Sequence, residues 1–77
     1  MWEVIGFERM VKSDGSVSYD LYAMKAFKPG ENVCGKKARR FWYRADEVDY
    51  VPEVGQEVII ETEMRGKYEI VVDIWVP

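Results

Sequence analysis

The chain has 77 residues, of which 48% are hydrophobic and 32% are charged, with a net charge of −3, one cysteine and no histidine. This length allows a single domain near the lower limit at which a core alone stabilises a chain, and the composition excludes disorder. Without histidine, a nucleophilic triad lacks its usual base and a zinc site would depend on carboxylates and one thiol. We therefore expect a protein that is not an enzyme, with no catalytic residues, no metal and no other cofactor.

The cellular compartment is predicted from the cysteine and from the N-terminal segment. Cys34 is the only thiol and cannot form an internal disulfide, which favours a reducing compartment. The opening residues MWEVIGFERM carry acids and an arginine among apolar residues, which is not typical of a signal peptide. No run approaches the roughly 18 apolar residues of a membrane span. We expect a soluble, cytoplasmic protein that does not contact membranes.

Alternation of apolar and polar residues with a period of two runs through the chain and predicts strands rather than helices. The first two strands are joined by residues 13–15, and pairing Val11 with Val17 leaves a three-residue loop that ends at Gly15. That loop length favours a glycine in the left-handed region. The five predicted strands are Trp2–Val11, Ser16–Phe27, Ala38–Ala45, Gln56–Met64 and Lys67–Val76.

Five short antiparallel strands predict an all-β fold, a small five-stranded antiparallel barrel in one domain over residues 1–77, because closure removes exposed edges. An OB-like barrel fits best, since a long first hairpin and a third strand are followed by a linker and a terminal hairpin. An SH3-like barrel is the alternative. In the terminal hairpin, the predicted inner face consists of Val58, Ile60, Thr62, Ile70, Val72, Ile74 and Val76, and the other face is acidic.

The segment GKKARRFWYRA, residues 35–45, contains five cations and three consecutive aromatic residues without an acid. Neighbouring side chains on a strand point to opposite faces. If Trp42 pointed inward, Arg40 and Arg44 would follow it. Burying an unpaired charge costs several kcal/mol or more, against roughly 1.5–3 kcal/mol gained by burying one large apolar side chain. We therefore predict that Phe41 and Tyr43 face the core, while Arg40, Trp42 and Arg44 face outward.

The second strand is expected to extend this outward surface. A register that pairs Phe27 with Lys37 places Tyr22 opposite Trp42 and Asp20 opposite Arg44, and a step of two residues keeps the same outward set. Unpaired bases stack on exposed aromatic rings while nearby cations bind phosphates. The long loop after the second strand adds Lys25, Lys28, Lys36 and Lys37. The predicted nucleic-acid-binding residues are Tyr22, Lys25, Lys36, Lys37, Arg40, Trp42 and Arg44.

Two functions follow from this surface. The first is a non-enzymatic module that binds single-stranded DNA or RNA with little sequence preference and takes no small-molecule substrate. The second is a barrel whose outward aromatics form a homodimer or another protein interface, with its arginines paired to surface acids. Residues 1–44 hold nine basic and five acidic side chains, a net +4, whereas residues 45–77 hold two and nine, a net −7. A local basic groove is therefore compatible with the overall −3.

Three segments, GSVSYDLYAMKAF, KKARRFWYRA and VPEVGQEVIIETEMRGKYEIVVDIWVP, give the chain a layout that resembles a known family. It is similar to the OB-fold single-stranded DNA-binding (helix-destabilising) proteins of filamentous phages and related mobile elements. The resemblance implies a homodimer that coats single strands cooperatively, with Tyr22, Arg40, Trp42 and Arg44 nearest to the contact surface. A protein-binding barrel encoded by a phage or conjugative element is the alternative origin.

Overall fold

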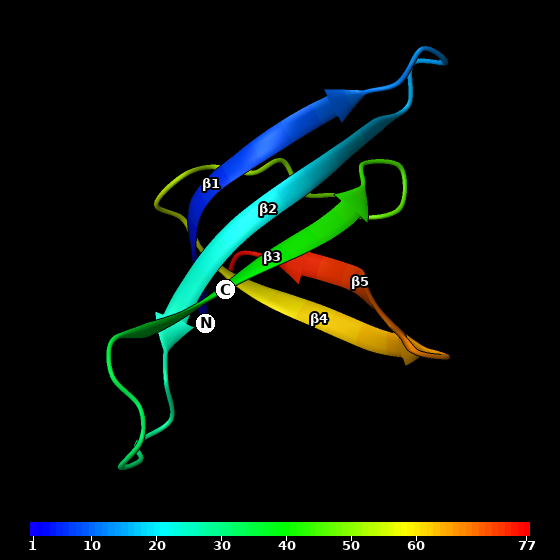
Figure 1. Cartoon of the computed structure of the whole chain (residues 1–77). Coiled ribbons are helices and arrows are strands. Elements are labelled where there is room, and N and C mark those ends of the chain that lie inside the picture. The colour runs from blue at the N-terminus through cyan, green and yellow to red at the C-terminus, as the bar shows by residue number, and fades with distance from the viewer.

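Five antiparallel strands make up the protein in a computed structural model that describes all residues from 1 to 77 (Figure 1). Each strand begins and ends within two residues of its predicted bounds, which confirms the all-β class. None of the segments is a helix that could span a lipid bilayer. The strands are β1 (Trp2–Val11), β2 (Val17–Ala26), β3 (Lys36–Arg44), β4 (Glu57–Arg65) and β5 (Tyr68–Trp75).

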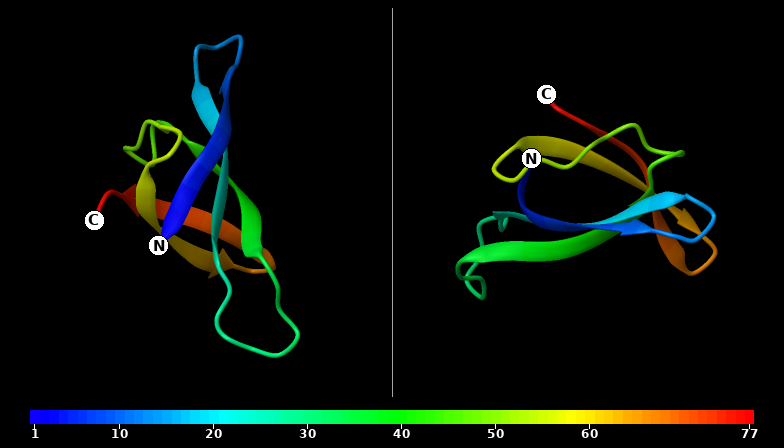
Figure 2. Two further views of the ribbon diagram at one scale, coloured as in Figure 1. Left: turned by 90° about the vertical axis from the view of Figure 1, so that its left-hand side faces the viewer. Right: turned by 90° about the horizontal axis from the view of Figure 1, so that it is seen from above.

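The strands lie in the order β3-β2-β1-β4-β5, and β1 joins the two halves of the sheet. It pairs with β2 along most of its length but with β4 only at Trp2 and Glu3. The sheet curls so that the hairpin β4–β5 covers one face of β1, β2 and β3 (Figure 2). The outermost strands, β3 and β5, form no ladder with each other. The expected barrel is therefore only approximate, because its last seam stays open.

The core lies between the two halves and receives apolar side chains from every strand. Leu21, Val4 and Val58 are fully buried. Phe41 is 4% and Tyr43 2% exposed, so the predicted inward face of β3 is confirmed. The sheet therefore directs the alternate β3 side chains, which include Arg40 and Arg44, to the opposite face.

The predicted inner face of the terminal hairpin is only partly right. Val58 and Ile74 are buried and Ile60 packs against the core, as expected. Val76 lies beyond the end of β5 and is exposed.

A bulge in β5 explains a further error in this hairpin. The register with β4 shifts between Glu61 and Thr62, so Thr62 lies opposite Val71. Val71 therefore packs against the core, in place of the predicted Ile70 and Val72. A bulge inserts one residue and reverses the side to which all following residues point. Uninterrupted alternation in the sequence gave no sign of it.

The turn between β1 and β2 forms as predicted. Val11 lies opposite Val17, and Gly15 has a φ of 87°, in the left-handed region. Asp14 Oδ1 accepts hydrogen bonds from the backbone N–H of Ser16 at 2.9 Å and from its hydroxyl at 2.7 Å. The backbone hydrogen bond from Ser16 is the main reason why the pKa of the Asp14 carboxyl lies below its ordinary value.

Two tyrosine hydroxyls hold the segment 45–56, which connects β3 to β4, against the core. The Tyr43 hydroxyl donates to the backbone carbonyl oxygen of Tyr50 at 2.8 Å, and the Tyr50 hydroxyl donates to Gln56 Oε1 at 2.6 Å. Burial raises the pKa of both tyrosines above the ordinary value, and that of Tyr43 by more. Both hydroxyls therefore remain hydrogen-bond donors at neutral pH.

We predict that Tyr43→Phe lowers the free energy of unfolding by about 1 kcal/mol, because the buried carbonyl of Tyr50 loses its donor. Urea unfolding followed by circular dichroism measures the change. Tyr68→Phe is the matched control, since the Tyr68 ring is exposed, and it should leave the midpoint unchanged. Equal effects of the two substitutions would contradict the assigned role of the Tyr43 hydroxyl.

Candidate nucleic-acid interface

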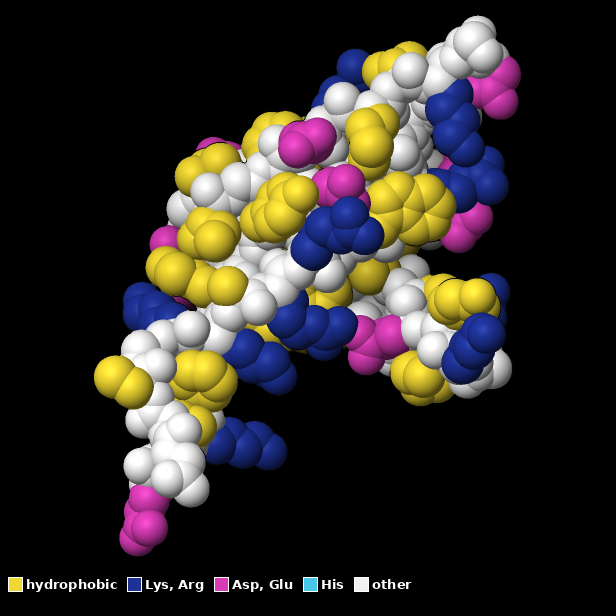
Figure 3. Space-filling model, viewed as in Figure 1, with side chains coloured by type: hydrophobic (Ala, Val, Ile, Leu, Met, Phe, Trp, Pro, Cys, Tyr) yellow, Lys and Arg dark blue, Asp and Glu magenta, His cyan; other side chains and the backbone are white.

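The outward residues of β2 and β3 form a surface on the side of the sheet turned away from β4 and β5. Trp42 is 48% exposed, the Arg40 side chain is 61% exposed, and Tyr22 is exposed beside them. The predicted orientation of the three consecutive aromatic residues is therefore confirmed. Figure 3 shows this outer face, where hydrophobic side chains surround a few charged ones. We call Tyr22, Arg40, Trp42 and Arg44 the platform.

The register between β2 and β3 differs by two residues from the one that we favoured. Tyr22 lies opposite Arg40 and Asp20 opposite Trp42, so the expected Tyr22–Trp42 cross-strand pair is wrong. A slip of two residues keeps every side chain on its face. Tyr22 and Trp42 are consequently diagonal neighbours, at a spacing of roughly 7–8 Å that aromatic side chains can bridge. Two rings thus share one face with a guanidinium between them.

The side chain of Asp20 is largely buried beneath the platform residues. Its side chain is only 13% exposed, and its Oδ1 is buried and accepts no hydrogen bond. Arg40 Nε lies 3.7 Å from that oxygen, close enough for charge attraction but too far for a hydrogen bond. The mostly exposed guanidinium of Arg40 is therefore held loosely and can turn toward a ligand.

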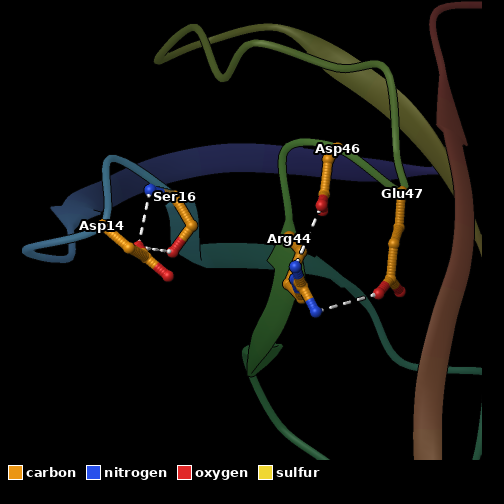
Figure 4. A network of polar contacts seen from close by, with 5 residues as sticks. All are labelled: Asp14, Ser16, Arg44, Asp46 and Glu47. Atoms are coloured by element: carbon orange, nitrogen blue, oxygen red, sulfur yellow. Dashed lines mark hydrogen bonds and ion pairs between the residues drawn. The ribbon is translucent and has the colours of Figure 1, made fainter.

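Arg44 ends β3 and does not pair with Asp20 as expected, because it lies opposite Ser18. Its Nη2 donates to Asp46 Oδ2 at 2.9 Å, and its Nη1 lies 3.6 Å from Glu47 Oε1 (Figure 4). Both acids belong to the turn that follows the strand. Exposed ion pairs contribute about 0–1 kcal/mol each, so an incoming phosphate could displace these carboxylates.

A cleft of about 270 Å³ opens beside the platform, along the unpaired edge of β3 and toward β5. In Figure 3 a hollow separates β3 from the tip of the β4–β5 hairpin, with charged side chains on both sides. The charged lining residues are Arg39, Arg40, Arg44, Arg65, Glu47 and Glu69. The cleft exists because the barrel is not closed.

Arg39 is a residue of this cleft that the sequence reasoning missed. Its guanidinium carbon lies 4.7 Å from the centroid of the Phe41 ring, and its Nη2 donates to Glu69 Oε1 on β5. This hydrogen bond lowers the pKa of the Glu69 carboxyl. A signal was present in the sequence, because Arg39 and Arg40 are adjacent and must point to opposite faces. An inward arginine required an acidic partner, and the bulge in β5 supplies it.

The structure does not bring all the predicted lysines to the platform. Lys36 shares the outward face of β3 with Arg40. Lys25 and Lys37 lie opposite each other on the inner face, where Lys25 Nζ is 4.5 Å from the centroid of the Trp2 ring. The predicted binding residues are thus divided between two faces of the sheet.

Comparison of the chain with protein-family models, curated proteins and solved structures gives no match. The similarity to phage single-stranded DNA-binding proteins therefore remains a prediction from the sequence pattern. No group of three or more His, Cys, Asp or Glu side chains lies close enough together to hold a metal ion.

We predict that Arg39→Gln raises the pKa of Glu69 toward its ordinary value of 4.5. The pKa is depressed in the folded protein, so the ion pair stabilises the fold above this value, and its contribution is lost as the pH falls through the depressed pKa. Carboxyl carbon NMR measures the titration of Glu69 directly. Arg65→Gln, in the same cleft but paired with Glu63, should not move it. An unshifted Glu69 in the Arg39 variant would contradict the bridge between β3 and β5.

Proposed function

We propose that the protein is a non-enzymatic module that binds single-stranded DNA or RNA across the outer face of β2 and β3. The exposed indole of Trp42, next to the exposed guanidinium of Arg40, carries the proposal. Base stacking on such a ring contributes roughly 1–3 kcal/mol per base, and a guanidinium binds phosphate oxygens in a fork. Tyr22 on the diagonal offers a second ring for stacking.

The spacing of the two rings favours a single strand over a duplex. Diagonal neighbours lie roughly 7–8 Å apart, about twice the 3.4 Å rise between stacked nucleotides of one strand in DNA. Bases that engage both rings are therefore spread apart, and their faces are free of neighbouring bases. Stacking accepts every base, so this mode of binding has little sequence preference.

Charge would confine the nucleic acid to this side of the protein. Residues 1–44 carry a net +4 and include the platform, whereas residues 45–77 carry a net −7 and include β4 and β5. A negative potential around the terminal hairpin would repel the phosphates there. The homodimer, the cytoplasmic location and the phage or mobile-element origin expected from the sequence belong to the same proposal.

One observation favours a protein partner as the second candidate. The arginines of β3 each have an acidic partner: Arg39 with Glu69, Arg40 with Asp20, and Arg44 with Asp46 and Glu47. Hydrophobic side chains also occupy much of the outer face in Figure 3. An apolar surface with internally neutralised charge and exposed aromatics is typical of protein interfaces. Oligonucleotide binding separates the two candidates.

We predict that oligo-dT or oligo-U quenches the fluorescence of the wild-type protein, and that Trp42→Ala weakens binding by roughly 5- to 150-fold. Anisotropy of a labelled oligonucleotide measures the affinity of both proteins. Trp75→Ala is the control, because Trp75 is exposed on β5, outside the platform, and its affinity should match the wild type. Absence of oligonucleotide binding to the wild type would reject the proposal and favour the protein partner.

We predict opposite effects at the two members of the Arg40–Asp20 pair. Arg40→Glu should lower affinity and reduce the slope of log affinity against log salt by about one, because a phosphate contact is lost. Asp20→Asn should raise affinity, because it removes a carboxylate that competes for Arg40. Lys12→Glu, in the turn after β1, is the matched charge change and should have little effect.

Size-exclusion chromatography of the same variants tests the alternative. Arg40→Glu should elute at the position of the wild-type protein. An Arg40→Glu variant that loses self-association instead would assign the platform to a protein interface.

A further inference from the structure

A second basic site lies on the other side of the sheet, at the base of the loop 27–35 that connects β2 and β3 (Figure 1). It is a pocket of about 330 Å³ that shares no lining residue with the cleft beside the platform. We call it the lysine pocket. It is lined by Lys25, Ala26, Phe27, Lys28, Val33 and Lys37.

The lysines of this pocket form no ion pair, although Lys25 also lines a neighbouring hollow with Glu3 and Glu57. All five ion pairs of the protein use arginine and none uses lysine. No acid lines the pocket. The positive charge of Lys37 contributes to the lowered pKa of the Glu69 carboxyl, but Glu69 forms its ion pair with Arg39. Three cationic side chains thus surround one hollow without a carboxylate partner, unlike every arginine of β3.

The strand register forces two of these charges together. Lys25 and Lys37 occupy directly opposing positions on β2 and β3. Like charges in such positions destabilise a sheet. The contact of Lys25 Nζ with the Trp2 ring fixes one of the two ammonium groups near the buried face. An anion bound between the lysines would remove the repulsion, and a multiply charged one would do so best.

We propose that the lysine pocket is a phosphate site that holds a phosphoryl group of the nucleic acid bound at the platform. Lysine binds phosphate as a point charge and needs no fixed fork geometry, so flexible ammonium groups suffice. Phe27 is exposed in the same pocket and offers a ring for the adjoining base. The source of the phosphate rests on the proposed function, whereas the site itself does not.

The position of the pocket sets the length of strand that it requires. Lys37 lies five residues from Trp42 along β3, a distance of about 17 Å at the rise of a strand. That span corresponds to about five stacked nucleotides at 3.4 Å each, or two to three at the roughly 7–8 Å spacing of the platform. A trinucleotide that engages both rings has only one nucleotide left to cross it. Because β3 has a free edge, a strand can pass from the outer face around this edge to the inner one. A trinucleotide on the platform would end before the pocket, and a dodecamer would reach it.

The first test uses tripolyphosphate alone as the probe, followed by NMR of the lysine side chains. We expect saturable shifts at Lys25 and Lys37 of the wild-type protein, and the shift at Lys25 should be lost in the double variant Lys28→Gln/Lys37→Gln. The control double variant Lys12→Gln/Lys67→Gln removes the same charge elsewhere and should bind as the wild type does. Absence of binding, or equal loss in both double variants, would overturn the site.

The second test identifies the source of the phosphate with oligonucleotides. Lys28→Gln/Lys37→Gln should weaken binding of a dodecamer about tenfold and reduce its salt slope by about one, and a trinucleotide should lose less. A loss restricted to 5′-phosphorylated dodecamers assigns a terminal phosphate, and a loss regardless of phosphorylation assigns the backbone. Equal losses for trinucleotide and dodecamer would overturn the path around β3.

The two proposals fail in different ways. Tripolyphosphate binding without any oligonucleotide binding would reject the proposed function and leave the lysine pocket as a site for free phosphates. Oligonucleotide quenching of Trp42 without tripolyphosphate binding would keep the function and overturn the pocket.

Discussion

The exclusion of two guanidiniums from the dry interior determines how β3 is oriented, and most of the structure follows from it. Arg40 and Arg44 flank Trp42 on one face, so Phe41 and Tyr43 must enter the core. Tyr43 then supplies the hydroxyl that holds the connection to β4, and Phe41 packs edge-to-face on Trp2. The same alternation that completes the core leaves an indole in water between two cations. Core and candidate site are thus two sides of one strand.

The open seam between β3 and β5 is the second feature on which the site depends. An exposed strand edge invites pairing with another chain, and charged side chains are one way in which proteins prevent this. Here Arg39 reaches across the seam to Glu69 and stacks on Phe41, which ties the two halves together without a ladder. The bulge in β5 is needed for this contact, because it turns the acid toward β3. The cleft with its arginines is therefore a consequence of incomplete closure.

The sequence predicted well to which face of the sheet the residues of β3 point, but it predicted poorly which residues lie opposite each other on neighbouring strands. Strand alternation determines whether a side chain points in or out, so the number of strands and the outward position of Trp42 could be predicted. It does not determine which residues lie opposite, because the nine residues 27–35 between β2 and β3 can be distributed between strand and loop in several ways. The register of Tyr22 was missed for this reason. The bulge near Val72 was missed because the alternation of residues in this hairpin is uninterrupted. Lys37 was assigned to a loop, although its adjacency to Lys36 in a longer β3 would have placed it on the inner face.

The protein contains two kinds of cation, and the difference bears on selectivity. The arginines of β3 each have a carboxylate partner, whereas the lysines at the base of the loop 27–35 have none. In the proposed function, a polyanion would meet unpaired charge at these lysines and would have to displace acids at the arginines of β3. A polyanion attracted by its charge alone would therefore bind weakly to this protein, whose net charge is −3. A single strand also has exposed bases that stack on Trp42 and Tyr22, whereas the bases of a duplex are already stacked. Because the acidic partners of the arginines weaken the binding of every polyanion that lacks exposed bases, they would favour single strands.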